Sequence, residues 1–258
     1  MMFIYGCLAI CAIVLLLMVY RYDMYDREPW YMLILAIMLG MLACVAVGTF
    51  EDYLFTEFQE FFSDAYALEK ESLATGLSEE LIKLFAVAII ALIGSRHFND
   101  PMDGLIYGAV VGLGFGLNES LFYLGLNGND LQLANLGENA VRLFLHLLLG
   151  GIGGFGLGLT QSSQRWRTWP FVFVTCLGTS IAIHTLWDYW LGLRDNDPLS
   201  DKMQQVTAVS LMGFLTLFFG LLVIIGAHSS RKAFAPTSPR KLWGWPFSMF
   251  RRNKKNRF

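Results

Sequence analysis

Ionisable side chains interrupt several apolar stretches of this sequence, and their types are those that activate water or bind metal ions. In chain order they are Glu79, Glu80, Glu119, His146, His184 and Asp188. Carboxylates and imidazoles act as general bases in hydrolysis and as zinc ligands in proteins. The sequence therefore predicts a hydrolytic or metal-binding site that is built from residues of separate segments.

The spacing of these residues places them on helix faces that also carry small residues. Three lines with four-residue spacing are present: Gly104, Gly108, Gly112 and Gly116, followed by Glu119; Arg142, His146, Gly150, Gly154 and Gly158; and Ser180, His184 and Asp188. Residues four apart share one face of a helix, and small residues let two helices approach closely. We expect three helices packed through small residues, with polar groups converging at one end of the contact.

Each polar group also has a structural explanation. The Glu79–Glu80 pair suits the capped first turn of a helix, and Glu79 with Lys83 suits an ordinary ion pair four residues apart. His146 alone fits a packing role better than a ligand role. The pair His184 and Asp188 suits a structural hydrogen bond, although a carboxylate also orients a histidine as a base or a metal ligand. Several such groups at one depth favour a functional site, because charge is costly in lipid.

Lipid is the solvent that the composition predicts for most of this chain. Of its 258 residues, 55% are hydrophobic and 16% are charged, which is more apolar than a soluble domain requires. Apolar stretches near the roughly 20 residues that cross hydrocarbon run over 2–20, 30–50, 79–95, 103–126, 140–160, 168–193 and 206–227. Backbone groups in hydrocarbon must pair within their own segment, so each stretch predicts a helix. The predicted fold is all-α, a polytopic membrane helical bundle of about seven transmembrane helices over residues 1–227, followed by a basic tail, 228–258.

Residues 51–78 separate the second and third stretches and are acidic and aromatic. Phe55, Phe58, Phe61 and Phe62 recur at helical spacing. This pattern predicts a helix that lies along the membrane interface, and a partly ordered acidic loop is the alternative.

The distribution of basic residues predicts the orientation. With seven spans and the C-terminus inside, fourteen Lys and Arg residues lie on the inner side and three on the outer side. Positive charge is enriched on the cytoplasmic side, so the N-terminus is expected outside. The basic tail is expected to contact anionic lipid and not nucleic acid.

Depth follows from this orientation. Glu119, His146 and His184 lie roughly 9 to 14 Å below the outer ends of their helices, at 1.5 Å per residue. They are expected to share one outward-facing, water-filled cavity, with Arg142 and Asp188 at its mouth.

Three motifs in this order resemble the PrsW family of intramembrane proteases, which is related to the CaaX-processing and bacteriocin-processing membrane proteases. The motifs are EExxK at residues 79–83, FxxxE at 115–119 and HxxxD at 184–188. The segment 26–30 and the glycine-rich run after His146 add to the resemblance, which covers roughly residues 21–195. One departure is Ser120, where the family often has Asn.

The resemblance implies hydrolysis of a peptide bond in a membrane-anchored protein, typically an anti-sigma factor that is cut near the outer face of the bacterial inner membrane. It also implies that Glu79 and Glu80 activate water and that Glu119, His184 and Asp188 complete the site.

The first hypothesis is therefore an intramembrane endopeptidase, with Glu79, Glu80 and His184 as catalytic residues. Zn²⁺ held by Glu119, His146, His184 and Asp188 is one version of the site. The sequence lacks the HExxH pattern, so a metal-free site in which Glu and His grip one water stays open.

Two other classes remain as alternatives. A proton-coupled transporter or channel would use the same Glu, His and Arg residues along a conduction path. Against it, the polar groups cluster at one depth, and no inverted repeat is evident. An inactive relative that acts as a membrane scaffold is the third hypothesis.

Overall fold

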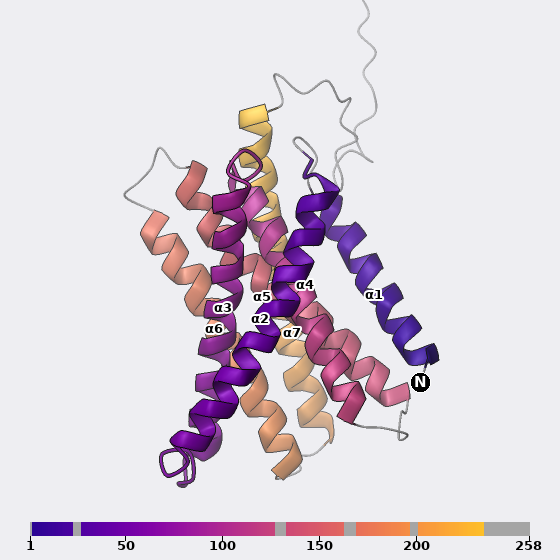
Figure 1. The fold of residues 1–258 in the computed structure, drawn as a ribbon, viewed down its shortest axis with the longest axis vertical. Helices are drawn as coiled ribbons and strands as arrows, with labels where there is room; N and C mark the ends of the chain where they lie inside the picture. The colour runs from indigo at the N-terminus through magenta and orange to yellow at the C-terminus, as the bar shows by residue number, and fades with distance from the viewer. Residues whose placement is uncertain (1, 23–26, 127–132, 163–168, 197–200, 235–258) are drawn as a thin grey trace, which may run out of the picture.

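A computed structural model describes the chain except for residues 1, 23–26, 127–132, 163–168, 197–200 and 235–258 (Figure 1). The described residues form seven α-helices and no strand: α1 Met2–Tyr20, α2 Trp30–Glu57, α3 Ala67–Ile93, α4 Pro101–Leu126, α5 Leu133–Ser162, α6 Trp169–Asn196 and α7 Asp201–Phe234. The predicted all-helical membrane bundle is confirmed, and α7 runs past residue 227, where the sequence placed the start of the tail.

Six of the seven helices are long and apolar enough to cross a membrane, and α3 is the exception among the described helices. The helix α3 contains the predicted span 79–95 up to Ile93, but Glu79, Glu80 and Lys83 interrupt its apolar run. All three charged side chains are buried. Because its charges face the protein, α3 can lie inside the bundle without exposing them to lipid.

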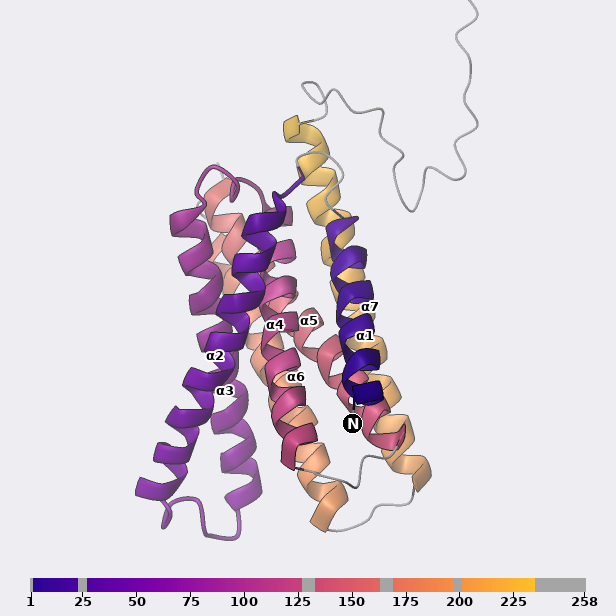
Figure 2. The same ribbon diagram turned by 45° about the vertical axis from the view of Figure 1, so that its right-hand side comes forward.

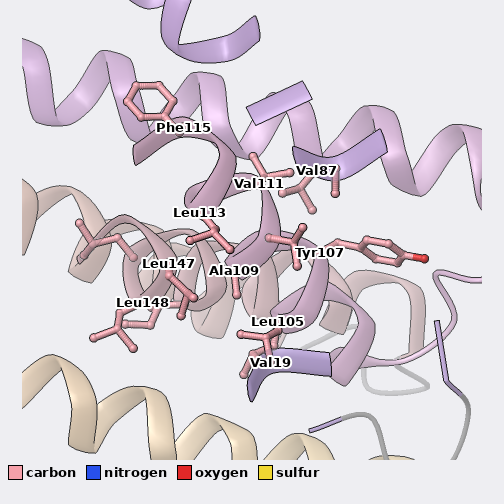
Figure 3. Packing of buried hydrophobic residues seen from close by; sticks show 14 of the residues in the cluster. Val19, Val87, Leu105, Tyr107, Ala109, Val111, Leu113, Phe115, Leu147 and Leu148 are labelled. Atoms are coloured by element: carbon pink, nitrogen blue, oxygen red, sulfur yellow. The ribbon is translucent and has the colours of Figure 1, made fainter. Parts of the chain in front are cut away.

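The bundle has α4 near its centre. Figure 2 shows α2 and α3 on one side and α1 and α7 on the other, with α4, α5 and α6 between them. Buried apolar side chains of α4 and α5 fill the centre, among them Leu105, Ala109, Leu113, Leu147 and Leu148 (Figure 3). The protein core is therefore built on the two helices that carry the glycine lines.

Those glycine lines bring the backbones of α4 and α5 into contact, as the spacing predicted. A Cβ atom added to Gly104 would lie 2.7 Å from the Cα of Gly158, and one added to Gly108 would lie 2.9 Å from the Cα of Gly154. Real Cβ atoms essentially never come so close to another atom. The approach of the two helices thus depends on the absence of side chains along this line.

The predicted interfacial helix over residues 51–78 is wrong. Residues 51–57 are the last turns of α2, residues 58–66 form a connection of turns, and residues 67–78 begin α3. The phenylalanines pack on one another across this connection, since Phe62 makes edge contacts with the rings of Phe55 and Phe61. The aromatic pattern that suggested one amphipathic helix is thus satisfied by two helix ends and the turns between them.

Candidate active site

Four helices contribute charged side chains to one cluster inside the bundle. The helix α3 supplies Glu79, Glu80 and Lys83, α4 supplies Glu119, α5 supplies Arg142 and His146, and α6 supplies His184 and Asp188. All the site residues that the sequence predicted therefore lie within one network of contacts. The polar groups converge in the structure, as the sequence predicted. Their chemical roles remain predictions.

Lys83 lies at the centre of this cluster. Its Nζ is 2.7 Å from Oε1 of Glu80, 3.3 Å from Oε2 of Glu79 and 2.9 Å from Nδ1 of His146. The ammonium group also lies 4.4 Å from the centre of the Phe115 ring. A lysine ammonium group can only donate hydrogen bonds, so Nδ1 of His146 is the acceptor.

The ring of His146 is therefore oriented from both sides. With Nδ1 as acceptor, the ring proton lies on Nε2, which is 2.6 Å from Oε2 of Glu119. Glu119 in turn contacts Nε of Arg142 at 3.2 Å. Arg142 also donates to Oδ1 of Asn139 at 2.7 Å and lies over the ring of Tyr123. This chain of contacts fixes the tautomer and the direction of the imidazole.

His184 is held in a similar way by Glu80. The Nδ1 atom of His184 is 2.8 Å from Oε1 of Glu80 and donates its proton there, because a carboxylate can only accept. The other ring nitrogen, Nε2, faces Oε2 of Glu79 at 3.5 Å and Oδ2 of Asp188 at 3.6 Å. Two carboxylates, Glu80 and Glu119, thus each orient one histidine.

Glu79 lies between the two histidines. Its Oε2 atom is 3.5 Å from Nε2 of His184 and 3.9 Å from Nδ1 of His146. This oxygen is buried and has no hydrogen-bond partner in the described part of the chain. Its nearest cationic neighbour is Nζ of Lys83 at 3.3 Å, and a bound water molecule or cation would supply the hydrogen-bond or ligand contact that this oxygen lacks.

The donor set for a metal differs from the one that the sequence suggested. Glu79, His146 and His184 offer ligand atoms that all lie within 4.8 Å of one another, and all three residues are buried. One carboxylate and two imidazoles with an open position form a typical catalytic zinc set, so these residues fit a metal by type. His146 can ligate through Nδ1 only when that atom no longer accepts a hydrogen bond from Lys83. Glu119 and Asp188 lie outside this set, and Glu119 instead stands behind His146, as outer-shell carboxylates do at zinc sites.

Backbone packing positions these side chains. A Cβ atom added to Gly112 would collide with the carbonyl oxygen of His146, and one added to Gly116 would lie 2.9 Å from Cδ2 of its ring. On the other side, a Cβ atom at Gly76 would lie 2.9 Å from the backbone nitrogen of Thr185, next to His184. The glycines of α3 and α4 therefore set how far the histidines stand from the glutamates.

A cavity of about 1400 Å³ opens beside the cluster, with residues of α2 to α7 in its walls. Glu79, Glu119, Arg142 and Asp188 line it, but His146 and His184, which were expected to share this cavity with Glu119, are not among its lining residues. Glu80 does not line it either. Of the two neighbouring glutamates, Glu79 is thus the one that meets whatever enters the cavity.

Sequence reasoning missed three features of the site. Lys83 was considered as a partner of Glu79 alone, but it also contacts Glu80 and His146. The sequence signal for this central role was a lysine inside an apolar span, three and four residues after two glutamates. Glu51 and Trp190 line the cavity, and nothing in their local sequence marked them, because they reach it through the packing of α2 and α6.

Comparisons with known proteins bear on this cluster. Residues 28–224 match the family described as PrsW family intramembrane metalloprotease. The chain is 29% identical over 229 residues to a protein named Protease PrsW from Bacillus subtilis (strain 168), with 78% of this chain and 94% of that protein covered. A protein of the same name from Clostridioides difficile (strain 630) is 25% identical, with 66% of this chain and 71% of that protein covered. No solved structure gives a significant match.

Proposed function

The chain belongs to the PrsW family of intramembrane proteases, and from this premise we propose that it cuts a membrane-anchored protein substrate near the outer face of the cell membrane. The observation that carries the proposal is the position of Glu79 on the cavity wall, with its Oε2 atom between two histidines that other carboxylates orient. A carboxylate in this position can reach a water molecule in the cavity and a peptide bond beside it.

In the metal-bound version of the site, Glu79, His146 and His184 would hold the ion, which would supply Lewis-acid activation of water when bound. In the metal-free version the same three groups grip the water. The description of the family as metalloproteases favours the first version. In both versions the tasks of the outer carboxylates are the same: Glu80 keeps Nε2 of His184 directed at Glu79, and Glu119 keeps Nδ1 of His146 directed inward.

The protein groups then carry the proton transfers of hydrolysis. In the metal-free version, the carboxylate of Glu79 accepts a proton from the water as the water oxygen attacks the scissile carbonyl carbon. His184, in its doubly protonated form, keeps one proton on Nδ1 toward Glu80 and donates the other from Nε2 to the oxyanion that forms. When the carbon–nitrogen bond breaks, Glu79 returns its proton to the leaving amine. Lys83 keeps one positive charge among the buried carboxylates throughout.

The sidedness of the reaction rests on the charge distribution. The cavity contains residues from the end of α2 and the first turns of α3, which is the end of the bundle that carries the connection 58–66. The excess of Lys and Arg in the segments that the sequence assigns to the inner side supports an outward-facing cavity. The tail beyond residue 234 lies outside the described residues, and its contact with anionic lipid stays a prediction.

The resemblance of the motifs supports an anti-sigma factor as the type of substrate. Proteomics of membrane fractions tests this directly. Cells with the wild-type protein are compared with cells that carry Glu79→Gln, and a single-span protein is expected to accumulate uncut in the variant. If no membrane protein differs in length between the two strains under conditions of stress, the proposed proteolysis is wrong.

A further inference from the structure

The cavity wall carries more negative charge than the catalytic cluster explains. Glu51 and Asp52 of α2 and Glu71 of α3 line the cavity in addition to the residues described above. Glu51 accepts a hydrogen bond from Ser78 at 2.5 Å, and none of the three acids forms an ion pair with a described residue. Among the described lining residues Arg142 is the sole base, and Glu119 already pairs with it.

These acids lie between the cluster and the open end of the bundle. Glu71 precedes Glu79 by eight residues on α3, which is about 12 Å at 1.5 Å per residue. An extended peptide covers that distance in about four residues. Glu51 lies nearer the cluster, because its hydrogen-bond partner Ser78 is adjacent to Glu79. A basic substrate side chain close to the cut site would therefore contact Glu51. One that lies a few residues closer to the cavity mouth would contact Glu71.

A second feature of the same wall points to a peptide. Trp190 of α6 lines the cavity, is 9% exposed, and its Nε1 has no hydrogen-bond partner in the described part of the chain. A buried indole N–H normally finds an acceptor. A peptide carbonyl in the cavity is such an acceptor once the ring turns, because Nε1 itself has almost no accessible surface in this structure.

Resting on the proposed function, we propose that the cavity selects substrates with Lys or Arg within about four residues of the cut, on the side that points to the cavity mouth. Glu51, Asp52 and Glu71 bind the basic side chain, and Trp190 donates to the peptide backbone. Basic residues are sparse on the outer side of membrane proteins. A preference for them there narrows the set of single-span proteins that the enzyme accepts.

Binding measurements with an inactive protein test the charge preference apart from cleavage. The probes are three labelled single-span peptides that are identical except for an outer flank of Lys-Lys, Gln-Gln or Glu-Glu. The receptor is full-length Glu79→Gln in nanodiscs of zwitterionic lipid. The Lys-Lys peptide is expected to bind about tenfold tighter than Gln-Gln and Glu-Glu weaker still, with the differences shrinking as salt is raised.

Two sets of variants assign the preference to its residues. The triple change Glu51→Gln, Asp52→Asn and Glu71→Gln should reduce the Lys-Lys advantage to about twofold or less. The control set has the same change of charge away from the cavity: Glu57→Gln, Glu60→Gln and Asp64→Asn. It should keep the advantage. Trp190→Phe should weaken all three peptides by about fivefold and leave their ratio unchanged.

Equal affinity for the three peptides, or an equal loss in the control set, overturns the charge selection. Unchanged affinity in Trp190→Phe overturns the role of the indole. Cleavage by the wild-type protein is scored separately. If the order of affinities holds but no peptide is cut, the proposed function fails and the selection stands. If all three peptides are cut and bind equally, the charge selection fails and the proposed function stands.

Discussion

Substitution of one glycine tests how tightly the fold and the site are coupled. Gly112 on α4 faces the backbone of His146 on α5, and a Cβ atom added there would lie 2.7 Å from the carbonyl carbon of that residue. Ordinary van der Waals contact begins at 3.4 Å, so Gly112→Ala requires α4 and α5 to separate by about 0.7 Å or more. No flexible side chain can relieve this contact, because the obstacle is main chain.

The expected cost has two parts. Overpacking at a backbone contact costs about 1 to 3 kcal/mol of stability. Displacement of a reacting group by nearly 1 Å lowers turnover by up to about a hundredfold. We therefore expect Gly112→Ala to melt at a lower temperature and to lose more activity than its loss of folded protein explains.

Gly125→Ala is the matched control, because it lies on the same helix and a Cβ atom there meets nothing within 4 Å. Thermal unfolding in detergent and cleavage of a single-span substrate measure the two effects. If Gly112→Ala melts and cleaves like Gly125→Ala, α4 and α5 do not approach as closely as described and the coupling is absent.

Three further predictions address the site and its orientation. Glu80→Gln should leave folding largely intact but lower turnover by about ten- to a hundredfold, since a neutral amide oxygen orients His184 more weakly than a carboxylate. The double variant Glu80→Gln with His184→Ala should be little worse than either single change, and independent additive losses would contradict the pairing. EDTA should abolish cleavage and Zn²⁺ should restore it, whereas undiminished cleavage after dialysis against EDTA would leave the metal-free version. A membrane-impermeant thiol reagent should label Glu60→Cys and not Ser238→Cys in intact cells, and the opposite pattern would reverse the orientation.

Much of the fold could be predicted from the sequence, because hydrocarbon restricts a spanning segment to helix. The helix α3 was harder, since its charged residues lower the hydropathy that identifies the other six. The end of α2 was misjudged because the phenylalanines of residues 55–62 fit a helix period, and a helical hairpin places the same residues in contact.

The site was predictable where its residues repeat at helical spacing. His184 with Asp188 and the glycine lines were found in this way. The sequence could not predict which of Glu79 and Glu80 faces the cavity. The two residues are of the same type and adjacent, so only helix packing decides the direction of each side chain. Their surroundings separate them: Glu80 contacts Lys83 and His184 in the interior, and Glu79 lines the cavity. The acids of α2 reach that cavity through tertiary packing, which no local pattern encodes.

The rate of peptide-bond hydrolysis by purified Glu79→Gln, relative to wild type, tests the central claim most directly. Both proteins are compared on one single-span substrate in one detergent, with melting curves to establish equal folding. We predict a loss of turnover of about a hundredfold or more with substrate binding retained, because the variant keeps the shape of the side chain and loses its capacity to take a proton or to hold a cation. Hydrolysis at a near wild-type rate by a well-folded Glu79→Gln would contradict the account and would favour a transport role for the cluster.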